Sequence, residues 1–180
     1  DAQMRGQLLD ELQLETDLRA ALTRHELVLH YQPLLDLRSG RLEGFEALVR
    51  WRHPVRGWCL PDAFVGLAEA TGLMPALGGF VLTEALRQLA RWRAESAGAG
   101  RLLLHVNVSG RQLQQADFGG LLLRVLQQTG VPPAHLALEL TESVLLEPSA
   151  ALDHALRTVR GLGVKLCMDD FGTGYSSLAG

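Results

Sequence analysis

Short runs of alternating hydrophobic and polar residues predict strands along the chain, and longer runs with apolar residues three or four apart predict helices. Strands are predicted at residues 27–37, 41–51, 102–108, 136–140 and 164–169. The turn sequence "RSG" separates the first two runs, so we expect them to form a hairpin. A loop rich in proline and glycine is expected between the second strand and about residue 61.

Helices are predicted in the remaining segments, at residues 61–70, 75–93, 109–128 and 149–160. The clearest is the second, in which one apolar stripe is formed by Leu77, Val81, Ala85, Leu89 and Trp92. Strands that alternate with helices at this spacing are typical of βαβ units and a parallel sheet.

A further helix, predicted at residues 4–24, allows two interpretations. Its apolar residues recur at roughly helical spacing: Met4, Leu8, Leu12, Leu18 and Leu22. This pattern suits a helix that packs on the domain and equally a connector from an upstream domain. Because the chain begins at Asp1 and not at a methionine, we expect it to be part of a longer protein.

Composition narrows the class of protein. The chain has 180 residues, of which 47% are hydrophobic and 21% charged, with a net charge of -3, as expected for one globular domain. No basic cluster marks a surface for polymeric nucleic acid. No apolar run approaches a membrane span. Cys59 and Cys167 lack metal-site spacing, which indicates reduced thiols in a cytoplasmic domain; a membrane anchor elsewhere in the parent protein stays open.

Polar residues at the ends of the predicted strands suggest a functional site. In the last three strands, Asn107, Glu139 and Asp169 lie opposite the Leu/Val face, and they are separated by 32 and 30 residues, about one βα unit each. In a βα barrel these positions face inward at the carboxyl ends of the strands, where chemistry is done. Glu46, near the end of its own strand, is a natural fourth member.

Four oxygen donors, three of them anionic, would repel one another unless a cation lay between them. Oxygen-only ligation favours Mg²⁺, Mn²⁺ or Ca²⁺ over Zn²⁺. Asp170 follows Asp169 directly, so the pair could serve two ions roughly 3.5–4 Å apart. A single acid at a strand end is more often a helix cap or an ion-pair partner, but the shared position of all four residues favours a metal site. His105 also faces inward, and we expect it to pack and not to bind metal.

Five blocks of sequence resemble the EAL domain family, the cyclic di-GMP phosphodiesterases of bacterial signalling proteins. The blocks are "YQPLLDL" (31–37), "EALVRW" (46–51), "NVS" (107–109), "ELTES" (139–143) and "DDFGTGYSSL" (169–178). They occur in the family's order, and the resemblance covers the chain from about Leu27 onward. A protein-kinase interpretation of "DFG" fails, because the glycine-rich loop, strand lysine and HRD segment of kinases are missing from the sequence.

The resemblance implies an α/β fold, a TIM-like (β/α) barrel with an antiparallel first strand, apparently truncated after the loop at residues 170–180. Residues 1–25 would then be an N-terminal helix or connector, and residues 26–180 an incomplete EAL domain. The chain alone is expected to be inactive, because a lysine, a glutamate proposed as general base and a glutamine come from later parts of the family's barrel.

The resemblance also implies roles for individual residues. One Mg²⁺ or Mn²⁺ would be bound by Glu46, Asn107, Glu139 and Asp169, and a second by Asp169 and Asp170. Glu142 would brace the loop that begins at Asp170. The expected catalytic residues are Glu46, Asp169, Asp170 and Glu142. Contacts to the dinucleotide are expected from Gln32, Leu48, Arg50 and Asp170.

The implied reaction is hydrolysis of one phosphodiester bond of cyclic di-GMP by a metal-activated water, giving linear pGpG. The alternatives are a catalytically silent receptor for cyclic di-GMP and a regulatory scaffold; the intact "EAL" and "DDFG" blocks favour the enzyme. A homodimer and an upstream sensor or GGDEF-type domain are the partners that the resemblance implies.

Overall fold

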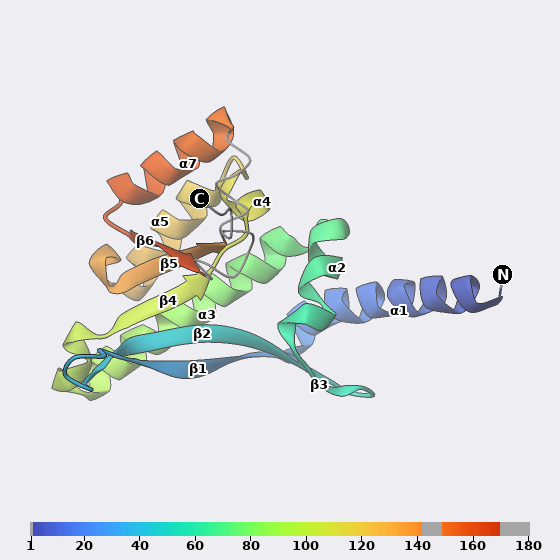
Figure 1. Cartoon of the computed structure of the whole chain (residues 1–180), viewed down its shortest axis with the longest axis horizontal. Coiled ribbons are helices and arrows are strands. Elements are labelled where there is room, and N and C mark those ends of the chain that lie inside the picture. The colour runs from blue at the N-terminus through green and yellow to red at the C-terminus, as the bar shows by residue number, and fades with distance from the viewer. Residues whose placement is uncertain (1, 142–148, 170–180) are drawn as a thin grey trace, which may run out of the picture.

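The computed structural model describes residues 2–141 and 149–169. Its strands form one sheet in the order β1-β2-β4-β5-β6, with β3 paired to β2 (Figure 1). The strands are β1 (Leu27–Leu35), β2 (Leu42–His53), β3 (Gly57–Cys59), β4 (Leu103–Asn107), β5 (Leu136–Thr141) and β6 (Lys165–Asp169). β1 and β3 run antiparallel to β2, whereas the pairs β2–β4, β4–β5 and β5–β6 are parallel. The predicted hairpin and parallel sheet are therefore confirmed.

The helices are α1 (Ala2–Arg24), α2 (Val65–Ala70), α3 (Met74–Glu95), α4 (Gly110–Leu113), α5 (Phe118–Thr129) and α7 (Ala150–Gly161), with 3-10 turns at Pro61–Ala63, Ala97–Arg101 and Pro133–His135. Of these, α3, α5 and α7 cover one face of the sheet (Figure 1). α3 packs on β1, β2 and β4, α5 lies between α3 and α7, and α7 reaches β6 (Figure 1). Within the described residues, no helix is long and apolar enough to cross a membrane.

The core lies between the sheet and these helices, on the predicted face of β4 and β5, whereas Met168, on the predicted core face of β6, is 37% exposed. Leu104 and Val106 of β4 and Leu136 and Leu138 of β5 are fully buried. The predicted stripe of α3 is also buried, except that Trp92 is half-buried. Its ring contacts those of Tyr31 on β1 and Phe45 on β2. Strand alternation thus leaves the polar residues of β4 and β5 on the opposite face.

Three of the predicted elements differ in detail. β3 lies within the segment expected to be a loop, and it is only three residues long. The helix predicted at residues 61–70 is a 3-10 turn followed by α2. The helix predicted at residues 109–128 is broken into α4 and α5, because α4 ends within one turn and α5 begins afresh at Phe118.

The N-terminal helix α1 packs on the domain near its carboxyl end. Leu18 and Ala21, near its end, are buried in the core, so this part packs on the domain. Leu12, earlier in the helix, is 52% exposed. Figure 1 shows the beginning of the helix extending away from the sheet.

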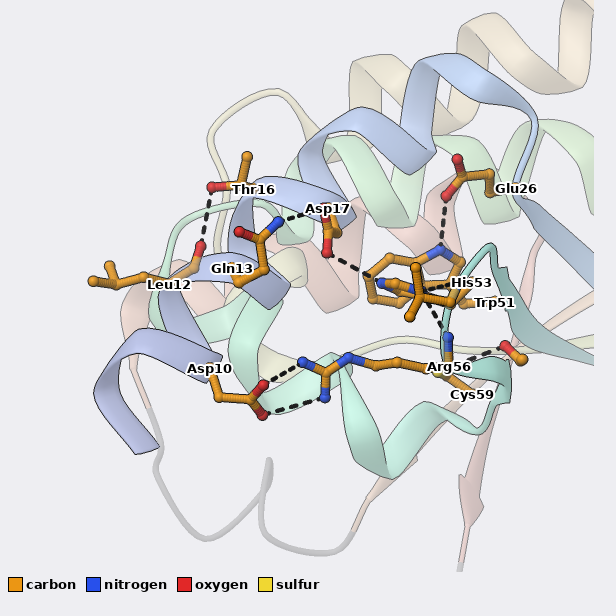
Figure 2. Close-up of polar contacts among 12 residues, drawn as sticks. Asp10, Leu12, Gln13, Thr16, Asp17, Glu26, Trp51, His53, Arg56 and Cys59 are labelled. Carbon is orange, nitrogen blue, oxygen red and sulfur yellow. Dashed lines mark hydrogen bonds and ion pairs between the residues drawn. The ribbon is translucent and has the colours of Figure 1, made fainter. Parts of the chain in front are cut away.

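Polar contacts join α1 to the turn between β2 and β3 (Figure 2). His53 is the last residue of β2 and is 4% exposed. Its Nδ1 accepts the backbone N–H groups of Val55 and Arg56, both at 3.1 Å. The ring proton is therefore on Nε2, which donates to Oδ2 of Asp17 at 3.2 Å. A buried imidazole thus fixes the turn and holds the helix against it.

Candidate metal and nucleotide site

Three predicted site residues lie on three adjacent parallel strands, although Glu46 lies within β2 and not, as predicted, near its end, because β2 continues to His53. Glu46 is on β2, Asn107 ends β4, and Glu139 is on β5. In the strand register, Glu46 pairs with His105, and Asn107 pairs with Glu139. Paired residues of neighbouring strands project from the same face, so these four side chains form two adjacent rows.

Two hydrogen bonds connect these rows diagonally. Nδ2 of Asn107 donates to Oε1 of Glu46 at 2.7 Å, and Nδ1 of His105 lies 2.5 Å from Oε1 of Glu139. Two side chains of β4 therefore hold the carboxylates of the neighbouring strands: Asn107 binds Glu46 of β2, and His105 binds Glu139 of β5. The two acids are separated by β4 and do not share a hydrogen-bond partner among these contacts.

β6 continues the row of strand ends. Asp169 is its last residue and pairs with Thr141, and Cys167 pairs with Glu139. Burial raises the pKa of the Cys167 thiol, and the charge of Glu139 raises it further, whereas Lys165 lowers it. Asp170 and Glu142, the other predicted acids, lie outside the described residues.

A cavity of about 830 Å³ opens at these strand ends. Its polar lining consists of Glu46, Asp62, Glu69, Asn107, Ser109, Arg111, Gln112, Gln114 and Glu139. Leu48, predicted to contact a dinucleotide, lies in the same lining. Gln32 is exposed and pairs with Glu46 across β1 and β2, and Arg50 is half-buried and donates to the carbonyl of Val49 at 2.8 Å. Neither Gln32 nor Arg50 lines this cavity as formed by the described residues.

The loop after Asn107 is fixed by a capping box, which was not predicted. Gln112 donates its backbone N–H to Oγ of Ser109 at 3.3 Å, and its Oε1 accepts the backbone N–H of Ser109 at 2.9 Å. Gln112 is only 4% exposed, and its side chain packs against Gly78 of α3. The signature Ser-x-x-Gln is visible in the sequence and could have identified this helix start.

Gly78→Ala is expected to lower the free energy of unfolding by about 1–2 kcal/mol, although alanine is the better helix former. A Cβ at this position would overlap Nε2 of Gln112 and lie 2.9 Å from its Cδ, so the capping box would have to move. Urea denaturation followed by circular dichroism measures the change.

Gly79→Ala provides the matched control one residue further along α3. Its new Cβ would meet only Cδ2 of Leu121, at an ordinary 3.7 Å. This variant should gain about 0.5–1 kcal/mol through helix propensity. Equal effects of the two substitutions would show that contact with Gln112 is unimportant.

Comparison with known proteins identifies the family. The model of the EAL domain matches residues 15–180. The chain belongs to the EAL domain family. Among its relatives, cyclic di-GMP phosphodiesterase NbdA of Pseudomonas aeruginosa is 45% identical over 94% of this chain, and cyclic di-GMP phosphodiesterase PdeR of Escherichia coli is 39% identical over 98%. The chain spans 21% and 26% of their respective lengths.

Solved EAL structures confirm the predicted fold class. The PaMucR phosphodiesterase in complex with c-di-GMP superposes with a TM-score of 0.84 at 41% identity, covering 92% of this chain and 66% of that one. The cAMP- and cyclic-di-GMP-bound EAL enzyme Bd1971 gives the same TM-score at 30% identity, covering 96% and 47%. EAL domains are TIM-like barrels, and the described sheet, with its antiparallel β1, corresponds to part of one.

The donor atoms of this EAL domain fit a hard divalent cation. Glu46 and Glu139 contribute carboxylates, and Asn107 uses its Nδ2 on Glu46, so Oδ1 is the atom that could ligate a cation. Within the described side chains, no group of three or more His, Cys, Asp or Glu residues is arranged as a metal site. Glu46, Asn107 and Glu139 line the same cavity, and Asp169, the fourth predicted ligand, ends the next strand.

Proposed function

We propose that this chain forms part of an EAL domain that hydrolyses cyclic di-GMP to linear pGpG with Mg²⁺ or Mn²⁺. One observation carries the proposal: Glu46, Asn107 and Glu139, on three adjacent strands, line one cavity, and Asn107 is hydrogen-bonded to Glu46. It is supported by the names of the relatives NbdA and PdeR and by the c-di-GMP complex of the similar PaMucR structure.

In this proposal the acidic residues and Asn107 bind two metal ions. Glu46, Asn107, Glu139 and Asp169 would hold one ion, and Asp169 with Asp170 a second. A bound divalent ion lowers the pKa of a ligated water and stabilises negative charge on phosphoryl oxygens. Asn107 keeps the Glu46 carboxylate turned toward the cavity through its amide.

The substrate contacts are proposals of the same kind. Leu48 supplies an apolar wall of the cavity. Arg50 would leave the carbonyl of Val49 and pair with a phosphodiester oxygen, to which a guanidinium is well suited. Gln32 projects next to Glu46 from β1 and would reach the dinucleotide from that side. Glu142 would brace the loop at Asp170.

The surroundings of the domain also belong to the proposal. Residues 1–25 would connect the EAL domain to an upstream sensor or GGDEF-type domain, which the relative MucR, named a bifunctional diguanylate cyclase and phosphodiesterase, supports. The extension of α1 away from the sheet fits such a connector. A homodimer is proposed on the family resemblance alone.

The test is hydrolysis of cyclic di-GMP by the complete gene product that carries this chain, with Mg²⁺, Mn²⁺ or Ca²⁺ added and after chelation. Production of pGpG should require a divalent ion and should be lost in Asp169→Asn, since a neutral amide binds a cation more weakly than a carboxylate does. Turnover that survives chelation would contradict the proposal. Nucleotide binding without turnover would support the receptor alternative.

A further inference from the structure

We infer that His105 is a positioning residue, which holds the Glu139 carboxylate in the orientation needed to bind the cation. This inference rests on the proposed function. Nδ1 of His105 lies 2.5 Å from Oε1 of Glu139. The sequence alone did not predict this contact. A side chain that merely fills space would not need its polar atom there.

The direction of this hydrogen bond follows from the chemistry of the pair. A carboxylate has no proton to donate, so Nδ1 of His105 carries the proton and Oε1 of Glu139 accepts it. Oε1 is then committed to the ring, and Oε2 is the oxygen that Glu139 can present to a cation. Both side chains are only about 15% exposed, at 15% and 14%, so water competes little for the bond.

The neighbouring residues explain why the ring fits. His105 pairs with Ala137 on β5, and Ala137 is fully buried and small. The imidazole can therefore lie over Ala137 and reach the next inward residue of the same strand, Glu139. A larger residue at position 137 would push the ring away from the carboxylate.

The arrangement is matched on the other side of β4. Asn107 holds Glu46 of β2 just as His105 holds Glu139 of β5, so each flanking acid has one donor on the central strand. Hydrogen bonds to metal-binding side chains typically matter by 10–100-fold in metal affinity. Loss of the His105 donor should therefore weaken binding of the ion, although no ligand is removed.

The experiment compares Mn²⁺ binding by the full gene product and its variants, measured from the free-ion signal in electron paramagnetic resonance. His105→Phe keeps a ring but has no donor, and it should weaken binding roughly 10–100-fold. His105→Asn places an amide nitrogen where Nδ1 was, and it should restore affinity to within about threefold of the parent on the same reasoning. His154→Phe, on the exposed surface of α7, is the control and should change nothing.

Three results would overturn the inference. Mn²⁺ affinity in His105→Phe equal to that of the parent would remove the positioning role. Equal losses in the Phe and Asn variants, with lowered unfolding temperatures measured without metal, would make the residue a packing element. A parent protein that binds no Mn²⁺ at all, and whose Glu139→Gln variant behaves identically, would overturn both this inference and the proposed function. The first two results would leave the proposed function standing.

Discussion

Glu46→Gln is expected to lower the rate of cyclic di-GMP hydrolysis by about 10³-fold, because a metal site loses one of its anionic ligands. Stabilisation of transition-state charge by a bound ion contributes several kcal/mol, and about 4 kcal/mol corresponds to a factor of about 10³. Glutamine keeps the shape of the side chain and an oxygen that can accept the Asn107 amide, so the fold should survive. The measurement is chromatographic production of pGpG at saturating Mn²⁺.

Glu43→Gln is the matched control. It is the same substitution on the same strand, three residues earlier, at an exposed position. Its rate should stay within about twofold of the parent, since surface substitutions away from a site seldom have large effects. A Glu46→Gln variant that is as active as this control would exclude Glu46 from the metal site, while equal losses in both would indicate a general effect of charge.

The inward face of the strands could be predicted because strand periodicity is exact. Asn107 and Glu139 could be assigned to one face from the alternation of Leu and Val alone, and the structure confirms this assignment. Their pairing partners could not be predicted. Whether Asn107 turns toward Glu139 beside it or toward Glu46 diagonally depends on rotamers and on the twist of the sheet, which no local pattern encodes.

The hydrogen-bond partners of His53 and His105 could not be predicted from the sequence either. The partner of His53 is Asp17, 36 residues earlier, and the partner of His105 is Glu139, 34 residues later. A histidine carries no periodic signal of its own, so its role depends on what the fold places beside it. β3 was missed for a different reason: a three-residue strand is too short to show alternation.

Gly44→Ala is expected to lower the free energy of unfolding by about 3 kcal/mol, more than the other glycine-to-alanine substitutions. Gly44 is buried at the first pair of the β2–β4 ladder, opposite Leu103. A Cβ there would overlap the carbonyl oxygen of Leu103 and lie 2.8 Å from its carbonyl carbon and 3.0 Å from its nitrogen. All three are backbone atoms, so the clash can be relieved only by moving the two strands apart.

Gly66→Ala separates this clash from the general effect of replacing glycine. Gly66 lies in α2, and a Cβ there would meet nothing within 4 Å, so this variant should gain about 0.5–1 kcal/mol. The urea midpoints of both variants, measured without metal, show whether each substitution stabilises or destabilises the protein. Because Gly44 lies two residues before Glu46, parting of β2 from β4 would also lengthen the hydrogen bond from Asn107. Gly44→Ala should therefore lose Mn²⁺ affinity as well as stability, whereas a variant as stable as the parent would mean that the strands can separate at this end without cost.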